Sequence, residues 1–326
     1  MATYLVTGGA GFIGSHLADR LLGAGHRVLA LDDLSTGSED NVAHLRTEPR
    51  FELTRGSIFE RGLLASLVDH CDGIFHLAAA VGVRLVVESP TRTIETNVLG
   101  TAAVLEVAVA AHTPLLLASS SEVYGKRSDV PFREADDLVF GQPQIGRWSY
   151  GCSKAIDEYL ALAYAREHAL PVVVARLFNT VGPRQSDRYG MVLPTFVRQA
   201  LRGQPITVHG DGQQRRCFAY VGDVVDALAR LIEAAGHPGL VVNVGSDEEV
   251  TIAELAERVR DACDSASTIT IIPYREAWDT GFEDMQRRVP DLERLRAAIG
   301  SVPSRTLDDI IAAVVAHERS RPSTGA

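Results

Sequence analysis

The chain has 326 residues, of which 46% are hydrophobic and 23% charged, and its formal net charge is −10. The length predicts about two domains at roughly 150 residues per domain, and the ordinary composition excludes a wholly disordered chain. The acidic total argues against a nucleic-acid-binding protein, which normally carries a basic face.

Short apolar runs alternate with helical patterns from the first residues onward. The runs of strand length are residues 4–7, 27–32, 51–54, 73–77, 114–119 and 171–177. The segments with helical patterning are residues 15–22, 59–69, 97–111 and 149–168. Most of the strand runs are continuously apolar, as strands covered on both faces must be. The alternation predicts right-handed βαβ units, and therefore an α/β protein with a doubly wound parallel sheet.

After residue 179 this alternation stops, and glycine and proline interrupt the chain. Residues 223–234, 251–261 and 307–319 are patterned as helices, and residues 240–244 and 269–272 as strands. We expect residues 240–244 to return to the main sheet. The predicted division is one domain of residues 1–178 plus about 219–248, and a smaller α/β domain of residues 179–218 plus 249–320. Residues 321–326 are predicted to form a flexible tail.

The four cysteines lie far apart, with neither a Cys-x-x-Cys pair nor clustered histidines. This spacing predicts no metal site and no disulfide framework, and it is typical of reduced intracellular thiols. No charged leader precedes the first strand, and no segment approaches the roughly 18 apolar residues of a membrane span. We therefore expect a cytoplasmic protein without a membrane partner.

The first strand runs directly into Thr-Gly-Gly-Ala-Gly-Phe-Ile-Gly at residues 7–14, which precedes a helix. Glycines there permit a tight turn and let backbone N–H groups approach a pyrophosphate at the helix N-terminus. The second strand ends at Asp32, whose carboxylate would bind a ribose diol and repel a 2′-phosphate. A glycine triplet alone is a weak signal, but this order of strand, turn, helix, strand and acid predicts an NAD site rather than an NADP site.

Tyr150 and Lys154 are separated by four residues on a predicted helix, so they share a face with Cβ atoms roughly 6 Å apart. A free phenol has a pKa of about 10, and a nearby ammonium together with a positively charged nicotinamide ring favours the phenolate. Tyr150 is therefore predicted to take a proton from a substrate hydroxyl that Ser120 holds in line. The same spacing also occurs on ordinary amphipathic helices, so Tyr150 and Lys154 indicate a catalytic pair only in combination with the glycine turn.

These motifs resemble the extended short-chain dehydrogenase/reductases that act on nucleotide sugars as epimerases and dehydratases. The shared landmarks are the Gly-x-x-Gly-x-x-Gly spacing, His-Leu-Ala-Ala at 76–79, Asn-Val-Leu-Gly-Thr at 97–101, Ser-Ser-Ser-Glu-Val-Tyr-Gly at 119–125 and Tyr-Gly-Cys-Ser-Lys at 150–154. The resemblance implies a Rossmann domain with bound NAD, a nucleotide-sugar-binding C-terminal domain, and a homodimer formed through residues 97–111 and 149–168. It implies cofactor contacts at Gly8, Gly11, Phe12, Ile13, Gly14, Asp32, Leu34, Ser35, Thr36, Gly37, Ile58, Leu77, Ala78, Ala79, Asn97, Ser119, Tyr150, Lys154 and Phe178. Of these, Asn97 is expected to have a structural role rather than a chemical one.

Glu122 separates the activities within this family. Nucleotide-sugar 4,6-dehydratases carry Asp-Glu at the positions of Ser121 and Glu122, because the leaving hydroxyl needs an acid. The Asp is absent here, and the Ser-Ser-Glu-Val-Tyr-Gly pattern resembles the UDP-glucuronate decarboxylases. The plainer interpretation of Glu122 is a solvated carboxylate beside a turn.

The resemblance also implies contacts with a UDP-sugar. These substrate contacts are Glu122, Asn179, Arg184, Val192, Leu193, Thr207, Val208, His209, Arg216 and Arg288. Arg288 matches a diphosphate-contacting residue, which suits the fork of a guanidinium. Arg216 matches an arginine that faces the sugar and supplies a proton at C5. The implied catalytic set is Ser120, Ser121, Glu122, Tyr150, Lys154 and Arg216.

The leading hypothesis is therefore decarboxylation of UDP-glucuronate after oxidation at C4, giving UDP-xylose or the free UDP-4-keto-pentose. A UDP-sugar 4-epimerase is the nearest alternative, because it needs nearly every residue named except Glu122. A non-catalytic NAD-sensing protein is a third reading, against which the intact Tyr150, Lys154 and Ser120 argue.

Overall fold

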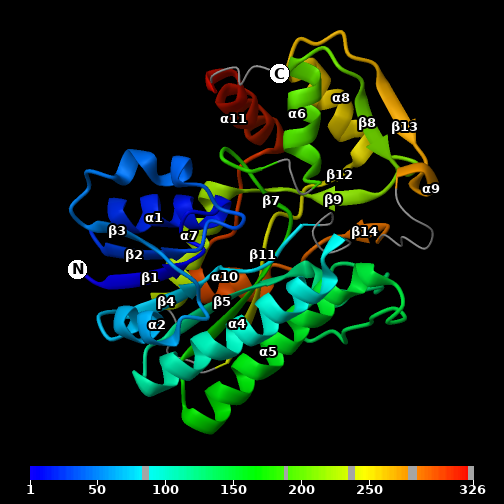
Figure 1. The fold of residues 1–326 in the computed structure, drawn as a ribbon. Helices are drawn as coiled ribbons and strands as arrows, with labels where there is room; N and C mark the ends of the chain where they lie inside the picture. The colour runs from blue at the N-terminus through cyan, green and yellow to red at the C-terminus, as the bar shows by residue number, and fades with distance from the viewer. Residues whose placement is uncertain (83–87, 187–189, 234–238, 278–284, 322–326) are drawn as a thin grey trace.

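The computed structural model describes residues 1–82, 88–186, 190–233, 239–277 and 285–321 (Figure 1). Its central layer is a seven-stranded sheet in the order β11-β6-β5-β4-β1-β2-β3, in which every neighbouring pair is parallel. The strands are β1 (Thr3–Thr7), β2 (Arg27–Asp32), β3 (Phe51–Arg55), β4 (Gly73–His76), β5 (Leu115–Ser120), β6 (Val172–Leu177) and β11 (Leu240–Val244). The strand order reverses between β1 and β4, which opens a crevice at their carboxyl ends. The predicted doubly wound parallel sheet is confirmed, and β11 joins it beside β6.

Helices cover both faces of this sheet. One face carries α1 (Phe12–Gly23), α7 (Val221–Glu233) and α10 (Glu293–Ile299), and the other carries α2 (Arg61–Val68), α4 (Pro90–Ala110) and α5 (Ser149–His168). In β1, Leu5 packs into the core on one side and Val6 into the core on the other. Successive side chains of a strand point to opposite faces, so a strand covered on both sides must be apolar throughout.

Most predicted boundaries lie within one or two residues of the observed ones, but α1 and α4 begin earlier. α4 starts at Pro90, seven residues before the predicted start, and Pro90 occupies the first turn, where its missing N–H costs nothing. The first turns of α4 are mainly polar, so they gave no apolar periodicity. Three short 3₁₀ segments, η1 (Glu39–Leu45), η2 (Ser121–Tyr124) and η3 (Gly146–Trp148), complete this part of the chain.

A second hydrophobic core lies among the C-terminal elements. It is formed by α6 (Val192–Leu201), α8 (Ile252–Ala262) and α11 (Leu307–Ser320) with β8 (Ile206–His209), which pairs in parallel with β13 (Ile269–Ile272). A capping box of Thr251 and Glu254 begins α8 and satisfies two N–H groups of its first turn. The remaining short elements are β7 (Thr180–Val181), β9 (Arg215–Cys217), β10 (Ala219–Tyr220), β12 (Glu249–Thr251), α9 (Tyr274–Ala277) and β14 (Arg287–Arg288). The exact domain boundaries stay a prediction.

Among the described residues, α4 is long and apolar enough by length and composition to cross a membrane, so the expectation that no segment approaches that size was wrong. In the structure α4 packs beside α5 over the sheet (Figure 1), as a core helix does. Of the predicted flexible tail, residues 322–326 lie outside the described residues.

Candidate active site

The glycine turn between β1 and α1 leaves no room for side chains. Gly8 has a φ of +72°, and a Cβ on Gly14 would lie 2.1 Å from the carbonyl oxygen of Gly8. Glycine is favoured where φ is positive and where backbone approaches backbone this closely. α1 begins directly after the turn, so its first N–H groups, which lack intrahelical partners, face the carboxyl edge of the sheet. The turn therefore fits the pyrophosphate of a dinucleotide.

Asp32 ends β2 beside this turn. Its carboxylate accepts hydrogen bonds from the backbone N–H groups of Ala10 at 2.9 Å and Leu34 at 2.8 Å. These bonds fix the carboxylate in the wall of the crevice, and each oxygen keeps lone-pair capacity for a ribose hydroxyl. Burial raises the pKa of Asp32, although the two backbone hydrogen bonds oppose that shift. The arrangement fits the ribose diol of NAD and disfavours an added 2′-phosphate.

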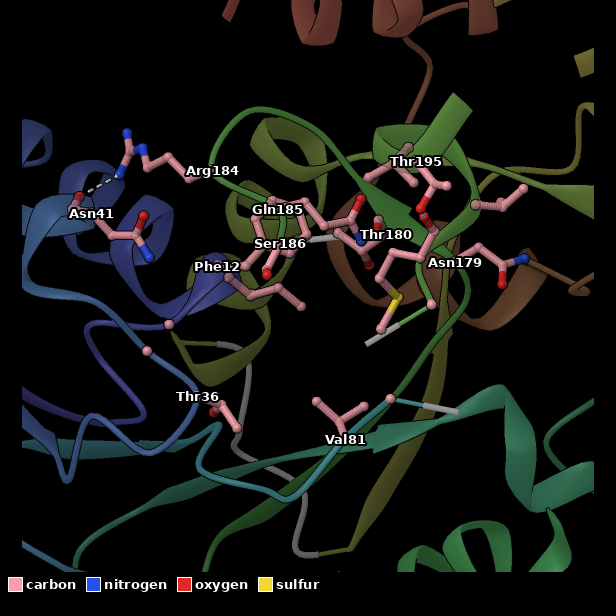
Figure 2. A pocket seen from close by; sticks show the side chains of 18 of the residues that line it. Phe12, Thr36, Asn41, Val81, Asn179, Thr180, Arg184, Gln185, Ser186 and Thr195 are labelled. Atoms are coloured by element: carbon pink, nitrogen blue, oxygen red, sulfur yellow. Dashed lines mark hydrogen bonds between the residues drawn. The ribbon is translucent and has the colours of Figure 1, made fainter. Parts of the chain in front are cut away.

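One cleft of about 2630 Å³ joins this turn to the C-terminal elements. Figure 2 shows Phe12 and Asn41 on the side of α1, with Asn179 and Thr195 across the cleft from them. Most of the predicted site residues line this cleft: Gly8, Gly11, Phe12, Ile13, Gly14, Asp32, Leu34, Ser35, Thr36, Gly37, Ile58, Leu77, Ala78, Ala79, Ser119, Ser120, Ser121, Glu122, Tyr150, Asn179, Arg184, Val192, Thr207, His209, Arg216 and Arg288. The structure thus brings the predicted cofactor and substrate residues into one continuous site.

Five predicted residues lie behind the cleft wall, each at most 2% exposed: Asn97, Lys154, Phe178, Leu193 and Val208. Leu193 and Val208 belong to the C-terminal core, so their side chains do not face the cleft, and their substrate contacts stay a prediction. In β8 the alternation of side chains buries Val208 and turns Thr207 and His209 toward the cleft.

Asn97 is a structural residue, as expected. Its Oδ1 accepts from the backbone N–H of Ala80 at 2.9 Å, and its Nδ2 donates to Ser153 Oγ at 3.0 Å. These bonds join the segment after β4 to the second turn of α5. Asn97 therefore holds the helix that carries Tyr150 against the cofactor side of the cleft.

Tyr150 and Lys154 lie on α5, which starts at Ser149 as predicted. The Ser120 hydroxyl at the end of β5 hydrogen-bonds with Tyr150, and this bond lowers the pKa of the phenol. Burial and the charge of Glu122 act more strongly and raise the pKa of Tyr150 above its ordinary value. The chain's own groups therefore keep the phenol protonated, and the predicted ionisation depends on the charge of the nicotinamide ring as well as on Lys154.

Glu122 is buried between two arginines rather than solvated. Arg147 donates from Nη1 to Oε2 at 2.6 Å and from Nη2 to Oε1 at 3.0 Å, and Arg288 Nη2 lies 2.8 Å from Oε1. Burial alone would raise the pKa of Glu122, but the charges of Arg147 and Arg288 outweigh it and lower the pKa to about 2. Glu122 is therefore a carboxylate at neutral pH and holds no proton to donate.

Arg147 was missed by the sequence analysis. It belongs to η3, just before Tyr150, and its side chain is 8% exposed. The chain is rich in arginine, so a single one carries no signal. The clue available was the position of Glu122 in a motif whose carboxylate, once buried, needs a cation.

Arg216 and Arg288 face each other across neighbouring strands. β9 and β14 pair in parallel with Arg216 opposite Arg288, and both residues are buried. The charge of Arg216 also lowers the pKa of Glu122, and Arg288 Nη1 lies 3.5 Å from Ser121 Oγ. Both guanidinium groups thus lie at the Tyr150 end of the cleft. Arg288 thus lies beside Ser121 and Glu122, and its predicted contact with a diphosphate stays a prediction.

Arg184 lines the cleft, but its guanidinium is held by the cofactor-binding half. It donates to the carbonyl oxygen of Asn41 at 3.2 Å, the dashed line in Figure 2, and to Asp19 Oδ2 at 2.5 Å. On the opposite side, Asn179 Nδ2 donates to the carbonyl oxygen of Cys217 at 2.9 Å. Arg184 therefore fastens the segment after β7 to α1 and η1, and the structure gives no support to its expected role at the substrate.

Within the part of the chain that the structure describes, no group of three or more His, Cys, Asp or Glu residues could hold a metal ion. All four cysteines are present as free thiols.

Comparisons with known proteins agree with this geometry. The chain is 39% identical over 293 residues to a UDP-N-acetyl-alpha-D-glucosaminuronate decarboxylase of Bacillus cytotoxicus, a match that covers 90% of each protein. It is 38% identical over 319 residues to UDP-glucuronic acid decarboxylase 1 of Arabidopsis thaliana, covering 97% of this chain and 70% of that relative.

The fold is similar to a crystal structure of UDP-glucuronic acid 4-epimerase from Bacillus cereus in complex with UDP-glucuronic acid and NAD. That similarity has a TM-score of 0.86 and 26% identity, and it covers 97% of this chain and 99% of that one. Residues 4–245 also match the family model described as the NAD-dependent epimerase/dehydratase family. The geometry of the glycine turn and Asp32 fits NAD, and the chain belongs to the NAD-dependent epimerase/dehydratase family.

Proposed function

We propose that the protein is an NAD-dependent decarboxylase of UDP-glucuronate. The observation that carries this proposal is the convergence of Arg147, Arg216 and Arg288 on the carboxylate of Glu122. Guanidinium groups bind carboxylates through charge-assisted hydrogen bonds, and these three arginines line the cleft at its Tyr150 end. A uronate substrate brings a carboxylate to this end of the cleft, whereas a neutral sugar does not.

The state of Glu122 also separates the related reactions. Dehydration requires an acid that protonates the leaving hydroxyl, and a carboxyl group with a pKa of about 2 is ionised at neutral pH. A 4-epimerase acting on neutral sugars has no use for the arginine cluster. A uronate 4-epimerase remains the competing function, and the decarboxylases with 38–39% identity favour decarboxylation over it.

The first half of the reaction is oxidation of the sugar at C4. NAD, when bound along the glycine turn and Asp32, supplies the hydride acceptor and a positive charge near Tyr150. Tyr150 removes the proton of the C4 hydroxyl, and Ser120 holds that hydroxyl in line through its contact with the phenol. Lys154 lies one turn further along α5 and provides the permanent positive charge that favours the phenolate.

Oxidation at C4 makes the C6 carboxylate that of a β-keto acid. The C5–C6 bond then breaks, carbon dioxide leaves, and the electron pair moves onto the C4 oxygen as an enolate. The proton now on Tyr150 stabilises this oxygen by hydrogen bonding. Arg216, which lies opposite Arg288 beside Glu122, gives a proton to C5 and completes the 4-keto-pentose, and return of the hydride to C4 would give UDP-xylose.

The test is to incubate the NAD-loaded protein with UDP-glucuronate carrying ¹³C in the carboxyl group and to follow the products by mass spectrometry. We expect labelled carbon dioxide and a UDP-pentose or UDP-4-keto-pentose. Retention of the substrate mass, with UDP-galacturonate as the product, would refute decarboxylation in favour of epimerisation. UDP-glucose serves as the control without a carboxylate, and UDP-N-acetylglucosaminuronate reports whether the C2 substituent matters.

We also propose that two copies associate through α4 and α5. Leu99 on α4 is 56% exposed, and Ile156 and Tyr159 on α5 are 48% and 69% exposed. These two helices lie side by side on the outside of the sheet (Figure 1), so large apolar side chains gather on one surface. A second copy of the chain would bury them in a four-helix arrangement.

Light scattering after size exclusion tests this association. We expect twice the chain mass of 35.1 kDa, and a single-chain mass for an Ile156→Glu, Tyr159→Glu variant. Ile271→Glu is the matched control, because Ile271 is 55% exposed but lies on β13. A wild-type protein that elutes as a single chain would contradict the proposal.

A further inference from the structure

A buried ion pair lies directly behind the catalytic tyrosine. Lys154 Nζ donates to Asp157 Oδ2 at 2.8 Å, and the two side chains are 2% and 0% exposed. Tyr150, Lys154 and Asp157 are spaced at i, i+4 and i+7 along α5, so all three lie on one face of the helix. The catalytic lysine thus has a resident anion that is fully withdrawn from solvent.

Among the described groups that shift the pKa of Asp157, Lys154 is the one cation. Thr101 on α4 hydrogen-bonds with Asp157, and its Oγ1 lies 3.2 Å from His76 Nε2. Burial and the charge of Lys154 lower the pKa of His76 to about 3, so this imidazole is neutral at working pH. The neighbouring carboxylate Glu158 adds negative charge from the same helix. Lys154 is therefore the cation that compensates Asp157 here.

Buried charges in proteins are stable only when they are paired. A lysine taken out of water without a counter-ion favours its neutral form, because the charged form loses its hydration. Removing one partner of a buried pair is costly for the same reason. An ammonium carries three N–H donors, and Asp157 uses one of them, which leaves two for the site.

We propose that Asp157 is a positioning residue for the reaction: its buried carboxylate keeps Lys154 as an ammonium and fixes its direction beside Tyr150. This inference rests on the proposed function only in taking Tyr150 as the base. It does not depend on which sugar binds.

Asp157 acts on Tyr150 in two opposite ways. Its own charge raises the pKa of Tyr150, although less than burial and Glu122 do. By keeping Lys154 charged, it would also favour the phenolate. The proposal predicts that losing the positive charge of Lys154 outweighs losing the negative charge of Asp157, so that Asp157→Asn makes Tyr150 harder to ionise.

The test titrates Tyr150 in the NAD-loaded protein without any sugar. Tyrosinate absorbance is recorded against pH for four proteins. The curve of Tyr150→Phe is subtracted from that of the wild type, and the curve of the double variant Asp157→Asn, Tyr150→Phe is subtracted from that of Asp157→Asn. We expect the midpoint to move upward by about one pH unit, which leaves about tenfold less phenolate at neutral pH. An unchanged or lower midpoint would overturn the proposal, since Lys154 would then keep its proton unaided.

Glu158→Gln is the matched control. Glu158 is the next residue of α5, is similarly buried, and forms an ion pair at 2.7 Å with Arg176 rather than with Lys154. The control is expected to lower the melting temperature while leaving the Tyr150 midpoint in place. A midpoint shift as large as that of Asp157→Asn would refute a specific role for Asp157.

A second variant covers the case in which Asp157→Asn does not fold. Lys154→Met, Asp157→Asn removes both charges of the pair, and a counter-ion role predicts that it folds where the single variant fails. If the double variant also fails to fold, Asp157 serves another structural purpose and the proposal is wrong. UDP-glucuronate turnover is measured separately on the wild type, so a failure of the proposed function leaves the Tyr150 titration interpretable.

Discussion

Replacement of Arg147 by methionine tests the electrostatics of the site most directly. Arg147 holds Glu122 through two hydrogen bonds, and the side chains of the pair are only 8% and 13% exposed. The pKa of Glu122 lies at about 2 against an ordinary value of 4.5. At 1.36 kcal/mol per pKa unit this difference corresponds to about 3 kcal/mol of stabilisation, net of the cost of burial. Arg147 is the largest favourable contributor, so we expect Arg147→Met to cost about 2 kcal/mol at neutral pH.

The sign of the pH dependence follows from linkage. A carboxyl group with a depressed folded-state pKa stabilises the fold fully above its unfolded value, and this contribution is lost as pH falls through the folded value. For Glu122 the window runs from about 4.5 down to about 2. Urea unfolding of wild type and variant should therefore show a constant difference near neutral pH that narrows as the pH falls below about 4.5.

The same variant is assayed for decarboxylation, and a variant of an exposed ion pair serves as its control. We expect carbon dioxide release to fall about 100-fold through kcat, because Glu122 loses the partner that fixes its orientation. Arg133→Met is the control, since Arg133 pairs with Asp291 at 3.3 Å while 68% exposed, and such pairs contribute at most about 1 kcal/mol. The reasoning fails if Arg147→Met is as stable as Arg133→Met, or if its loss of stability does not change with pH.

Three further predictions concern the cofactor turn, the base and the arginine cluster. Gly14→Ala places a Cβ 2.1 Å from the oxygen of Gly8 and should abolish NAD retention after purification, whereas Gly23→Ala on the same helix meets nothing within 4 Å and should retain NAD. Tyr150→Phe should lower turnover by about 10² to 10⁴-fold with the NAD content unchanged; residual activity near that of the wild type would remove it as the base. Arg216→Met should raise the KM for UDP-glucuronate about tenfold and leave calorimetric binding of UDP-glucose unchanged, and an equal loss for both would assign Arg216 to the nucleotide.

The fold was predictable wherever the signal was local. β2 (Arg27–Asp32) and α5 (Ser149–His168) have the boundaries expected from the sequence, because an apolar run and a helical pattern each end at clear punctuation. The cofactor half of the site was predictable for the same reason. The glycine turn and Asp32 lie on adjacent elements, and the β1–β2 pairing brings them together without any long-range information.

The sugar end was less predictable because its contacts join distant segments. Arg147 and Glu122 are 25 positions apart, and they meet only because η2 follows β5 while η3 leads into α5. Arg288 reaches Ser121 across 167 positions, through the register of β14 with β9. A pattern of residue types does not contain these long-range contacts, so neither the pairing of Arg147 with Glu122 nor the position of Arg288 beside Ser121 was predicted. The burial of the Leu193 and Val208 side chains was not predicted either, because a motif does not show which face of an amphipathic element turns to the cleft.

The arginine cluster around Glu122 lies inside a chain whose net charge is −10. The two are compatible because the charges of the surface and those of the buried cluster act over different distances. Salt screens the long-range field of the surface over about 8 Å, whereas buried charges interact through a poorly screened interior. Glu122 lets three arginines converge without a substrate, since an isolated buried cation is costly. In the proposed reaction a uronate carboxylate enters beside Glu122 and meets the same arginines, whose charge-assisted hydrogen bonds let it stay ionised. Glu122 then acts as a fixed anion that holds the arginines in place, and not as an acid.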